Sequence, residues 1–185
     1  MRISLIVAGC QLKDKPNLLG IGQQGNLPWR LKTEMAHFTK MTKLASENRK
    51  NAVLMGRKTW ESIPSKFRPL PQRFNAVITS NLEYKVEESD AKVFHSIEDG
   101  LEFCRNQDFE TCWIIGGSEI YNFVLKKNLW DRIYLTKIGQ EFACDRFFPE
   151  SEENWTEIFD PDNVSTKQNE EKGINFTYHI YEKKL

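Results

Sequence analysis

Glu34 is the acidic residue whose position most clearly suggests chemistry. It comes three residues after Leu31 and four before Phe38, so on a helix it shares the face of these apolar side chains. A carboxylate there either reaches solvent from the first helical turn, where the helix dipole favours it, or is buried with hydrogen-bond partners. The residues alone favour the exposed alternative. A buried Glu34 would need a partner such as a cationic or amidine-like ligand.

Two segments lead from an apolar run through glycine into a helix start. The run Val53–Met55 precedes Gly56 and two cations, and the run Trp113–Ile115 precedes two glycines. Backbone N–H groups at a helix start bind phosphate, and glycines let a ligand approach the backbone closely. Each junction alone also fits an ordinary turn or tight strand–helix packing. Two of them in one sheet favour a nucleotide site at the carboxyl ends of the strands.

The segment Gly20–Gly25 matches the dinucleotide-binding pattern GxGxxG letter by letter. That motif requires a strand directly before the glycines and a helix opening from them. Here Pro16–Leu19 precedes, and Pro28 follows at a place that disfavours a continuing helix. We therefore predict that Gly20–Trp29 is a flexible loop that closes over a ligand, rather than a dinucleotide-binding turn.

Other common chemistries lack the residues they need. The three histidines have no metal-ligand spacing, and the chain contains no HExxH, GxSxG or GxxxxGK[ST] pattern. The four cysteines are scattered without a CxxC pair, as is typical of reduced thiols. We therefore expect no metal site.

Length and charge narrow the class of protein further. The chain has 185 residues, and 26 Lys and Arg balance 26 Asp and Glu. This length suits a single domain over residues 1–185, and zero net charge argues against broad binding to nucleic acid or membranes. No run approaches the roughly 20 apolar residues of a membrane span, and no secretory signal is evident. We expect a cytoplasmic protein.

Strands and helices that alternate along the chain must position these residues. Short apolar runs predict strands buried on both faces, and runs with more alternation predict half-exposed strands. The predicted strands are Ile3–Ala8, Asn51–Met55, Phe74–Ile78, Cys112–Ile115, Arg132–Thr136 and Ile174–Tyr181. The predicted helices are Leu31–Leu44, one that begins at Ser96, and Glu119–Lys127. Their order predicts a mainly parallel α/β sheet with an antiparallel C-terminal edge.

In order and spacing, these segments closely resemble dihydrofolate reductase over nearly the whole chain. The segments that carry the resemblance are Gly20–Gly22, Leu27–Trp29, Met55–Trp60, Arg68–Leu70 with Arg73, Ile115–Gly117 with Tyr121, and Phe147–Pro149. Each is weak alone, but the ordered set is specific. The resemblance implies a twisted, mostly parallel eight-stranded sheet with an antiparallel C-terminal strand and about four flanking helices. It also implies a stand-alone reductase rather than one fused to thymidylate synthase.

The resemblance implies an activity as well. This is the NADPH-dependent reduction of 7,8-dihydrofolate to 5,6,7,8-tetrahydrofolate, which supplies one-carbon carriers for thymidylate and purine synthesis. The expected partners are dihydrofolate and antifolate inhibitors, and the expected form is a monomer. Two other interpretations stay open: a catalytically silent nucleotide- or pterin-binding protein, and a related pteridine or pyrimidine reductase. Glu34 and Trp29 argue against the first, and Arg73 argues for a substrate with a glutamate tail.

The roles of individual residues are also implied by the resemblance. Glu34 would bind nitrogen 3 and the 2-amino group of the pterin, with support from Thr136. Trp29 and Leu27 would lie beside them, and Trp29 would hold an ordered water. Arg73 would bind the α-carboxylate of the glutamate tail. The other residues implied at the substrate are Ile6, Val7, Met35, Phe38, Ser62, Ile63, Pro64, Phe67, Leu70, Ile115 and Tyr121. Those implied at NADPH are Ala8, Gly20, Ile21, Gly22, Gly25, Asn26, Gly56, Arg57, Lys58, Thr59, Thr79, Ser80, Asn81, His95, Gly116, Gly117, Ser118, Glu119, Ile120 and Tyr121.

Two positions depart from the family pattern in ways that bear on binding. Ser80 stands where many members carry an arginine for the 2′-phosphate of NADPH. The charge at that place must then come from Arg57, Lys58 or His95. Gln72 stands where glycine often precedes the arginine of the substrate site, so the turn there is expected to differ.

Overall fold

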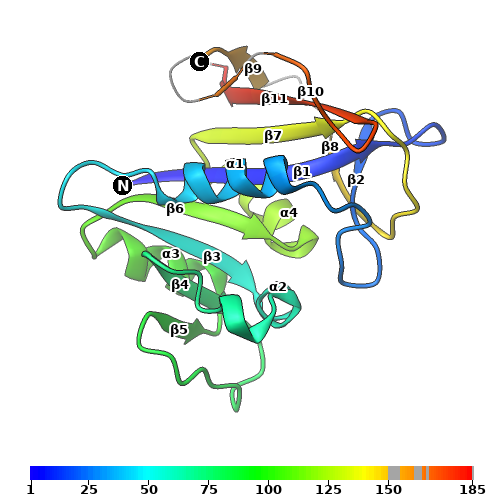
Figure 1. Ribbon diagram of the computed structural model, residues 1–185. Coiled ribbons are helices and arrows are strands. Elements are labelled where there is room, and N and C mark those ends of the chain that lie inside the picture. Colours follow the sequence, from blue (N-terminus) through cyan, green and yellow to red (C-terminus); the bar gives the residue numbers. More distant parts are fainter. Residues whose placement is uncertain (150–154, 161–163, 166, 185) are drawn as a thin grey trace.

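The computed structural model describes residues 1–149, 155–160, 164–165 and 167–184 (Figure 1). Its strands are β1 (Arg2–Gln11), β2 (Leu18–Gly22), β3 (Lys50–Gly56), β4 (Arg73–Ile78), β5 (Ala91–Phe94), β6 (Phe109–Gly116), β7 (Arg132–Ile138), β8 (Arg146–Pro149), β9 (Trp155–Ile158), β10 (Asn169–Glu171) and β11 (Ile174–Lys183). Its helices are α1 (Lys32–Lys43), α2 (Arg57–Ser62), α3 (Ile97–Arg105) and α4 (Ser118–Lys126), with one 3-10 turn at Ser65–Phe67.

Parallel strands form the centre of one twisted sheet. Its main path runs β10-β11-β7-β1-β6-β3-β4-β5, and β2, β8 and β9 pair outside this path. β1 is parallel to β6 and β7, and β3 is parallel to β4 and β6. β11 is antiparallel to β7. This order confirms the predicted α/β fold with an antiparallel C-terminal strand.

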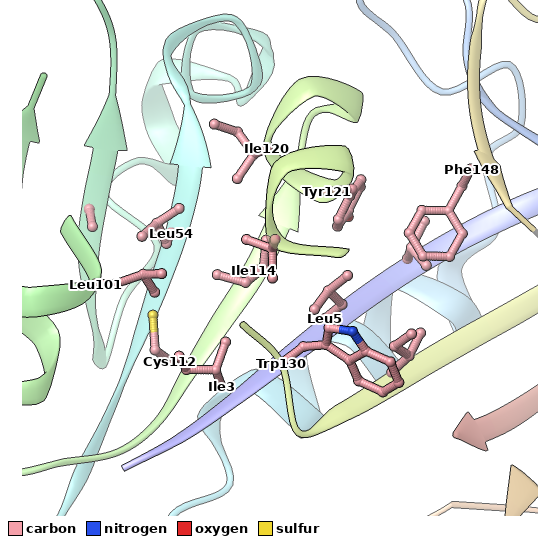
Figure 2. Packing of buried hydrophobic residues seen from close by; sticks show 14 of the residues in the cluster. Ile3, Leu5, Leu54, Leu101, Cys112, Ile114, Ile120, Tyr121, Trp130 and Phe148 are labelled. Carbon is pink, nitrogen blue, oxygen red and sulfur yellow. The ribbon is translucent and has the colours of Figure 1, made fainter. Parts of the chain in front are cut away.

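Helices cover both faces of the sheet, because successive residues of its central strands are apolar on both sides. Leu54 of β3 points to the face of α3 and α4, where it shares a core with Leu101 and Ile120 (Figure 2). The next residue, Met55, points to the opposite face and lies in a core with Met41 of α1. The continuous apolar runs of the sequence therefore correspond to strands covered on both sides.

The helices begin where local patterns predict them. The Ser96 side chain accepts a 3.0 Å hydrogen bond from the backbone N–H of Asp99, which caps α3. α2 and α4 start directly after Gly56 and Gly117, as the two glycine junctions indicate. α1 starts and ends one residue inside the predicted range.

Five short strands have no clear pattern in the sequence: β2, β5, β8, β9 and β10. β2 extends into the segment predicted as a loop, because Gly20 pairs with Cys10 of β1 and with Phe147 of β8. The prediction that a loop starts at Gly20 is therefore wrong. A tight turn follows β2 instead, where Gln23 and Asn26 exchange two backbone hydrogen bonds of 2.9 and 3.0 Å.

Two expected absences concern the described residues only. None of the described helices is both long and apolar enough to cross a membrane. Among the same residues, no group of three or more His, Cys, Asp or Glu side chains could hold a metal ion.

Candidate active site

The strands β1 and β6 stop pairing part-way along the sheet. β1 pairs with β6 only from Arg2 to Leu5, whereas it pairs with β7 from Ser4 to Cys10. The chain leaves β1 toward β3 and later returns to place β6 and β7 on either side of β1. Open α/β sheets bind ligands at such a switch point, beyond the carboxyl ends of the strands.

Glu34 is buried in the first turn of α1, with 6% of its surface exposed. Thr136 Oγ1 donates a 3.3 Å hydrogen bond to Glu34 Oε1. Burial raises the pKa of Glu34 from 4.5 to about 7, because removal of water disfavours the carboxylate more than the Thr136 hydrogen bond favours it. The exposed alternative, which the residues alone favour, is therefore wrong.

Hydroxyl groups from three elements lie in the surroundings of this acid. Thr136 lies in β7 between Ala8 of β1 and Tyr178 of β11. Burial raises the pKa of Tyr178 to about 12, and the negative charge of Glu34 contributes to this shift. The pKa of Tyr121 in α4 is also raised, first by burial and then by the Glu34 charge. Glu34 therefore lies close enough to both tyrosines at the switch point for its charge, when ionised, to disfavour their deprotonation.

Trp29 precedes α1 and is buried, with its ring 5.6 Å from that of Phe142. Its Nε1 has no hydrogen-bond partner within the described protein. Buried N–H groups normally have one, so Trp29 can donate to a ligand or a water. Leu27, two residues earlier, is 45% exposed and lies at the surface.

Apolar side chains cover the α1 face of the sheet near Glu34. Ile6 of β1 and Met55 of β3 are buried there. The partly buried residues that pack against this cluster include Phe38, Ile63, Leu70 and Ile115. Met35, Ser62, Pro64 and Phe67 are exposed. Val7 packs in the core of the opposite face, so only its backbone is available on the side of the acid.

Arg73 is a buried cation at the start of β4, with 3% of its surface exposed. Its Nη1 donates a 2.6 Å hydrogen bond to Thr42 Oγ1, and its Nε donates one of 3.1 Å to the carbonyl of Pro71. Burial lowers its pKa from 12.5 to about 10, so it remains charged at neutral pH. Within the described residues no carboxylate pairs with it. A buried cation of this kind suits an anionic ligand.

The turn before Arg73 keeps a glycine-like shape. Gln72 has a φ of 64°, in the left-handed region that favours glycine. The Asn75 side chain accepts a 2.9 Å hydrogen bond from the backbone N–H of Leu70 and donates one of 3.1 Å to the Leu70 carbonyl. These two bonds hold the segment before Arg73 in place. The expectation of a different turn is not supported.

The two glycine junctions lie side by side. Gly56 ends β3 and Gly116 ends β6, and neither α2 nor α4 has a side-chain cap at its start. A Cβ atom added to Gly56 would lie 3.9 Å from the backbone nitrogen of Gly117. Arg57 adds a cation, which pairs with Glu61 at 3.1 Å. Free N–H groups and nearby cations form a favourable place for phosphate.

The predicted adenosine end lies beyond β4 and β5. Thr79 is buried, and Ser80 and Asn81 after it are exposed. His95 follows β5, and its Nδ1 lies 3.1 Å from the carbonyl of Thr79. These four residues therefore gather at the carboxyl edge of the sheet, next to the junction at Gly56.

Packing within the protein explains two of the residues that the resemblance implies at NADPH, Gly20 and Ile21 of β2. A Cβ atom on Gly20 would lie 2.5 Å from Cys144 Sγ, so this glycine is required by packing. Ile21 is partly buried against the core on the α3 and α4 face. Gly25 and Asn26 are exposed in the turn after β2.

A surface hollow of about 670 Å³ lies between the β1–β2 connection and residues 139–141, and neither Glu34 nor Arg73 lines it. Its charged side chains include Lys13 and Glu141, which form a solvent-exposed ion pair with 3.7 Å between Nζ and Oε2. Its lining holds no buried titratable group. We therefore assign the candidate active site to the region of Glu34.

Comparisons with known proteins show the family of the chain. A family model described as "Dihydrofolate reductase" matches residues 2–183. The chain is 38% identical over 187 residues to the dihydrofolate reductase of Heliothis virescens, covering 99% of this chain and 98% of that protein. It is 38% identical over 172 residues to the dihydrofolate reductase of Bos taurus, covering 89% of this chain and 91% of that protein. It is 36% identical over 194 residues to that of Candida albicans, covering 98% of this chain and 97% of that protein. The chain belongs to the dihydrofolate reductase family.

The sequence gives no indication of three residues that support the candidate site. Tyr178 flanks Thr136, Thr42 holds Arg73, and Glu171 binds the start of α1 through two backbone N–H groups. None has a local signal, because each acts on a residue far away in the sequence. Only the strand register and the fold bring them to the site.

Proposed function

We propose that Glu34 binds the pterin of dihydrofolate and that Arg73 binds its glutamate tail in this enzyme. As a member of its family, the protein reduces dihydrofolate to tetrahydrofolate with NADPH. The observation that carries the assignment is the burial of Glu34 against Thr136. Such an acid needs a partner, and the pterin edge with nitrogen 3 and the 2-amino group donates two N–H groups to one carboxylate.

The raised pKa of Glu34 suits this role. At about 7, the side chain is partly protonated at neutral pH in the free protein. Binding of the pterin edge favours the ionised form, because the two N–H donors replace lost water. The carboxylate then orients the ring and favours positive charge on it. We propose that a water held by Trp29 Nε1 delivers the proton to nitrogen 5.

The residues present also fit NADPH. When bound, this cofactor supplies a hydride from carbon 4 of its nicotinamide to carbon 6 of the pterin. We propose that Ala8, Ile115 and Tyr121 surround the nicotinamide at the switch point. The adjacent Gly56 and Gly117 would let the cofactor approach the backbone, because a side chain there would occupy the space between the junctions.

The phosphates would be held next to these glycines. The N–H groups at the starts of α2 and α4 have no side-chain cap, and Arg57, Lys58 and Thr59 follow Gly56 directly. The exposed turn after β2 would then cover the bound nicotinamide and exclude water from the reacting atoms.

We propose that the enzyme works as a monomer in the cytoplasm and is inhibited by antifolates. All four cysteines are free thiols, which supports a reducing compartment. Gel filtration of the purified enzyme tests the monomeric state, fractionation of the source cells tests the location, and an activity assay with an added antifolate tests the inhibition. An elution volume of a dimer, activity confined to a membrane or secreted fraction, or unchanged activity with the antifolate would contradict the respective statement.

An absorbance assay tests the assigned roles. Purified protein, NADPH and dihydrofolate are mixed, and loss of the nicotinamide absorbance is followed. We expect Glu34→Gln to lower kcat/KM for dihydrofolate about a hundredfold or more, because the amide cannot accept both pterin N–H groups. Glu98→Gln, which changes a first-turn acid of α3 on the other face, is the matched control. Equal rates in both variants would reject the role of Glu34.

A further inference from the structure

The first turn of α1 takes its cap from the distant C-terminal part of the chain. Leu31 precedes the helix and provides no side-chain acceptor. The first N–H groups of such a helix lack partners unless other groups supply them. Here Lys32 N and Thr33 N donate 2.8 Å hydrogen bonds to the two carboxylate oxygens of Glu171. Glu171 ends β10 and lies 139 residues beyond Lys32.

The charge of this cap is stable at neutral pH. The hydrogen bonds from Thr33 and Lys32 lower the pKa of Glu171, so its carboxylate stays ionised. A negative charge at this position also complements the positive end of the helix dipole. The buried acid of the active site, Glu34, is the next residue after Thr33. The cap therefore acts on the backbone that directly carries the buried acid.

The hairpin of β10 and β11 contacts α1 at two further places. Lys172 Nζ donates a 3.3 Å hydrogen bond to the carbonyl of Arg30, just before the helix. Further along, the ring of Tyr178 stacks on His37, with centroids 3.8 Å apart and planes inclined by 22°. Tyr178 also pairs in register with Thr136 of β7. The hairpin thus contacts α1 on both sides of the buried acid and adjoins the strand that carries its hydrogen-bond donor.

We propose that Glu171 is a positioning residue for Glu34 in the binding of dihydrofolate. Its carboxylate fixes the backbone of the first turn of α1, so that Glu34 meets Thr136 and the pterin without first ordering that turn. A group fixed before the ligand arrives lowers the entropic cost of binding. Glu171 itself touches no substrate in this account. The inference rests on the proposed function, which gives Glu34 a substrate to bind.

Glu171→Gln is the direct test. The amide keeps one acceptor oxygen, turns an NH₂ group toward the other backbone donor, and removes the charge. We expect the dissociation constant of dihydrofolate, measured by quenching of tryptophan fluorescence, to rise about tenfold, while that of NADPH changes less than about twofold. Glu110→Gln is the matched control, because Glu110 also accepts a backbone N–H, from Ser46 at 2.7 Å. Unchanged dihydrofolate affinity in Glu171→Gln would overturn the proposal.

A double-variant cycle separates positioning from general damage to the fold. If Glu171 acts through Glu34, the Glu34→Gln variant has already lost what Glu171→Gln removes. Adding Glu171→Gln to Glu34→Gln should then change the dihydrofolate dissociation constant less than about twofold. A further tenfold loss would overturn the proposal, since it would show that the two residues act independently.

Hydrogen exchange provides a readout that does not depend on ligands. The amides of Lys32 and Thr33 should exchange faster in Glu171→Gln than in the wild type, and Glu171→Asp should restore part of the protection and part of the affinity. If Glu171→Gln does not fold, Glu171→Asp alone decides: normal affinity together with unprotected amides rejects the role. A wild type that neither binds nor reduces dihydrofolate would instead reject the proposed function itself.

Discussion

The hydroxyl of Tyr121 donates a 2.7 Å hydrogen bond to the carbonyl oxygen of Ile6, at the point where β1 and β6 stop pairing. The register of the two strands ends at Leu5, so the next carbonyl of β1 takes its donor from α4. Burial raises the pKa of the Tyr121 hydroxyl, which therefore remains a donor at neutral pH. One side chain thus ties a helix to the strand end beside which we place the nicotinamide.

Replacement of Tyr121 by Phe tests this contact. The carbonyl of Ile6 would lose its donor in a buried place, and the free energy of unfolding should fall by about 1–3 kcal/mol. Urea denaturation at neutral pH measures this loss. An unchanged midpoint with an unchanged slope would show that the hydrogen bond adds no stability.

The second prediction concerns Glu34 and pH. Its pKa of about 7 in the folded protein exceeds the ordinary value of 4.5, so folding favours the protonated acid. The associated stability is fully present below about pH 4.5 and is lost as the pH rises through about 7. Glutamine cannot ionise. Glu34→Gln should therefore gain about 3 kcal/mol relative to the wild type between pH 4.5 and pH 8.

Thermal or urea unfolding of both proteins across this range gives the comparison. Groups other than Glu34 titrate equally in the two proteins, so their effects cancel in the difference. A difference in stability that does not change with pH would mean that Glu34 titrates in the folded protein as it does in the unfolded chain. A variant that is more stable at pH 8 yet less active would show that the acid is retained for function.

Arg73→Leu tests the glutamate-tail site. Loss of the charge-assisted hydrogen bonds to a carboxylate should raise KM for dihydrofolate about a hundredfold. A dihydropterin with only a methyl group at carbon 6 is the control substrate, and its kinetic constants should not change. Arg73→Lys should restore little, because an ammonium cannot form the paired hydrogen bonds of a guanidinium. Equal losses with both substrates would show that Arg73 only stabilises the fold.

Much of the fold follows from local patterns, and the part that does not has a physical reason. The central strands are continuous apolar runs because both faces are covered, as Leu54 and Met55 illustrate. The short strands depend on partners far along the chain. Leu19 of β2, for example, pairs with Phe148 of β8. Strands of three to five residues carry too few side chains for a periodic signal.

In the candidate site, too, some features follow from local patterns and others depend on residues far away in the sequence. The glycine junctions are visible locally, because a strand, a glycine and a helix follow one another in the sequence. The burial of Glu34 depends on Thr136, 102 residues later, and no pattern around Glu34 reveals that partner. Local reasoning therefore favours an exposed acid. The association of Glu34 with a pterin depends instead on the ordered motifs of the whole chain.

Ser80→Arg tests how the 2′-phosphate is recognised. Ser80 is exposed two residues after the end of β4, so a guanidinium there would add a charge at the expected adenosine end. Affinity for NADPH should rise about tenfold and that for NADH should not change, because only NADPH carries the extra phosphate. Isothermal titration with both cofactors measures this. Ser89→Arg is the control, since Ser89 is exposed just before β5, at the end of the parallel strands opposite to Ser80. Equal gains for both cofactors would place the phosphate elsewhere.

The last prediction distinguishes packing from ligand binding at Gly20. An added Cβ would lie 2.5 Å from Cys144 Sγ and 2.7 Å from Cys144 Cβ, so Gly20→Ala should lower the free energy of unfolding by about 1–3 kcal/mol without any ligand. Gly22→Ala is the control, because the nearest atom to its Cβ lies at 3.5 Å.

A second substitution in Gly20→Ala shows which atoms cause the loss. Cys144→Ala removes the sulfur but leaves the Cβ atom, and should restore only part of the stability. Cys144→Gly removes both and should restore more of it, less the general cost of an added glycine of about 0.5–1 kcal/mol. If Gly20→Ala keeps full stability but loses NADPH affinity, the glycine serves the cofactor and not the contact between β2 and the segment before β8.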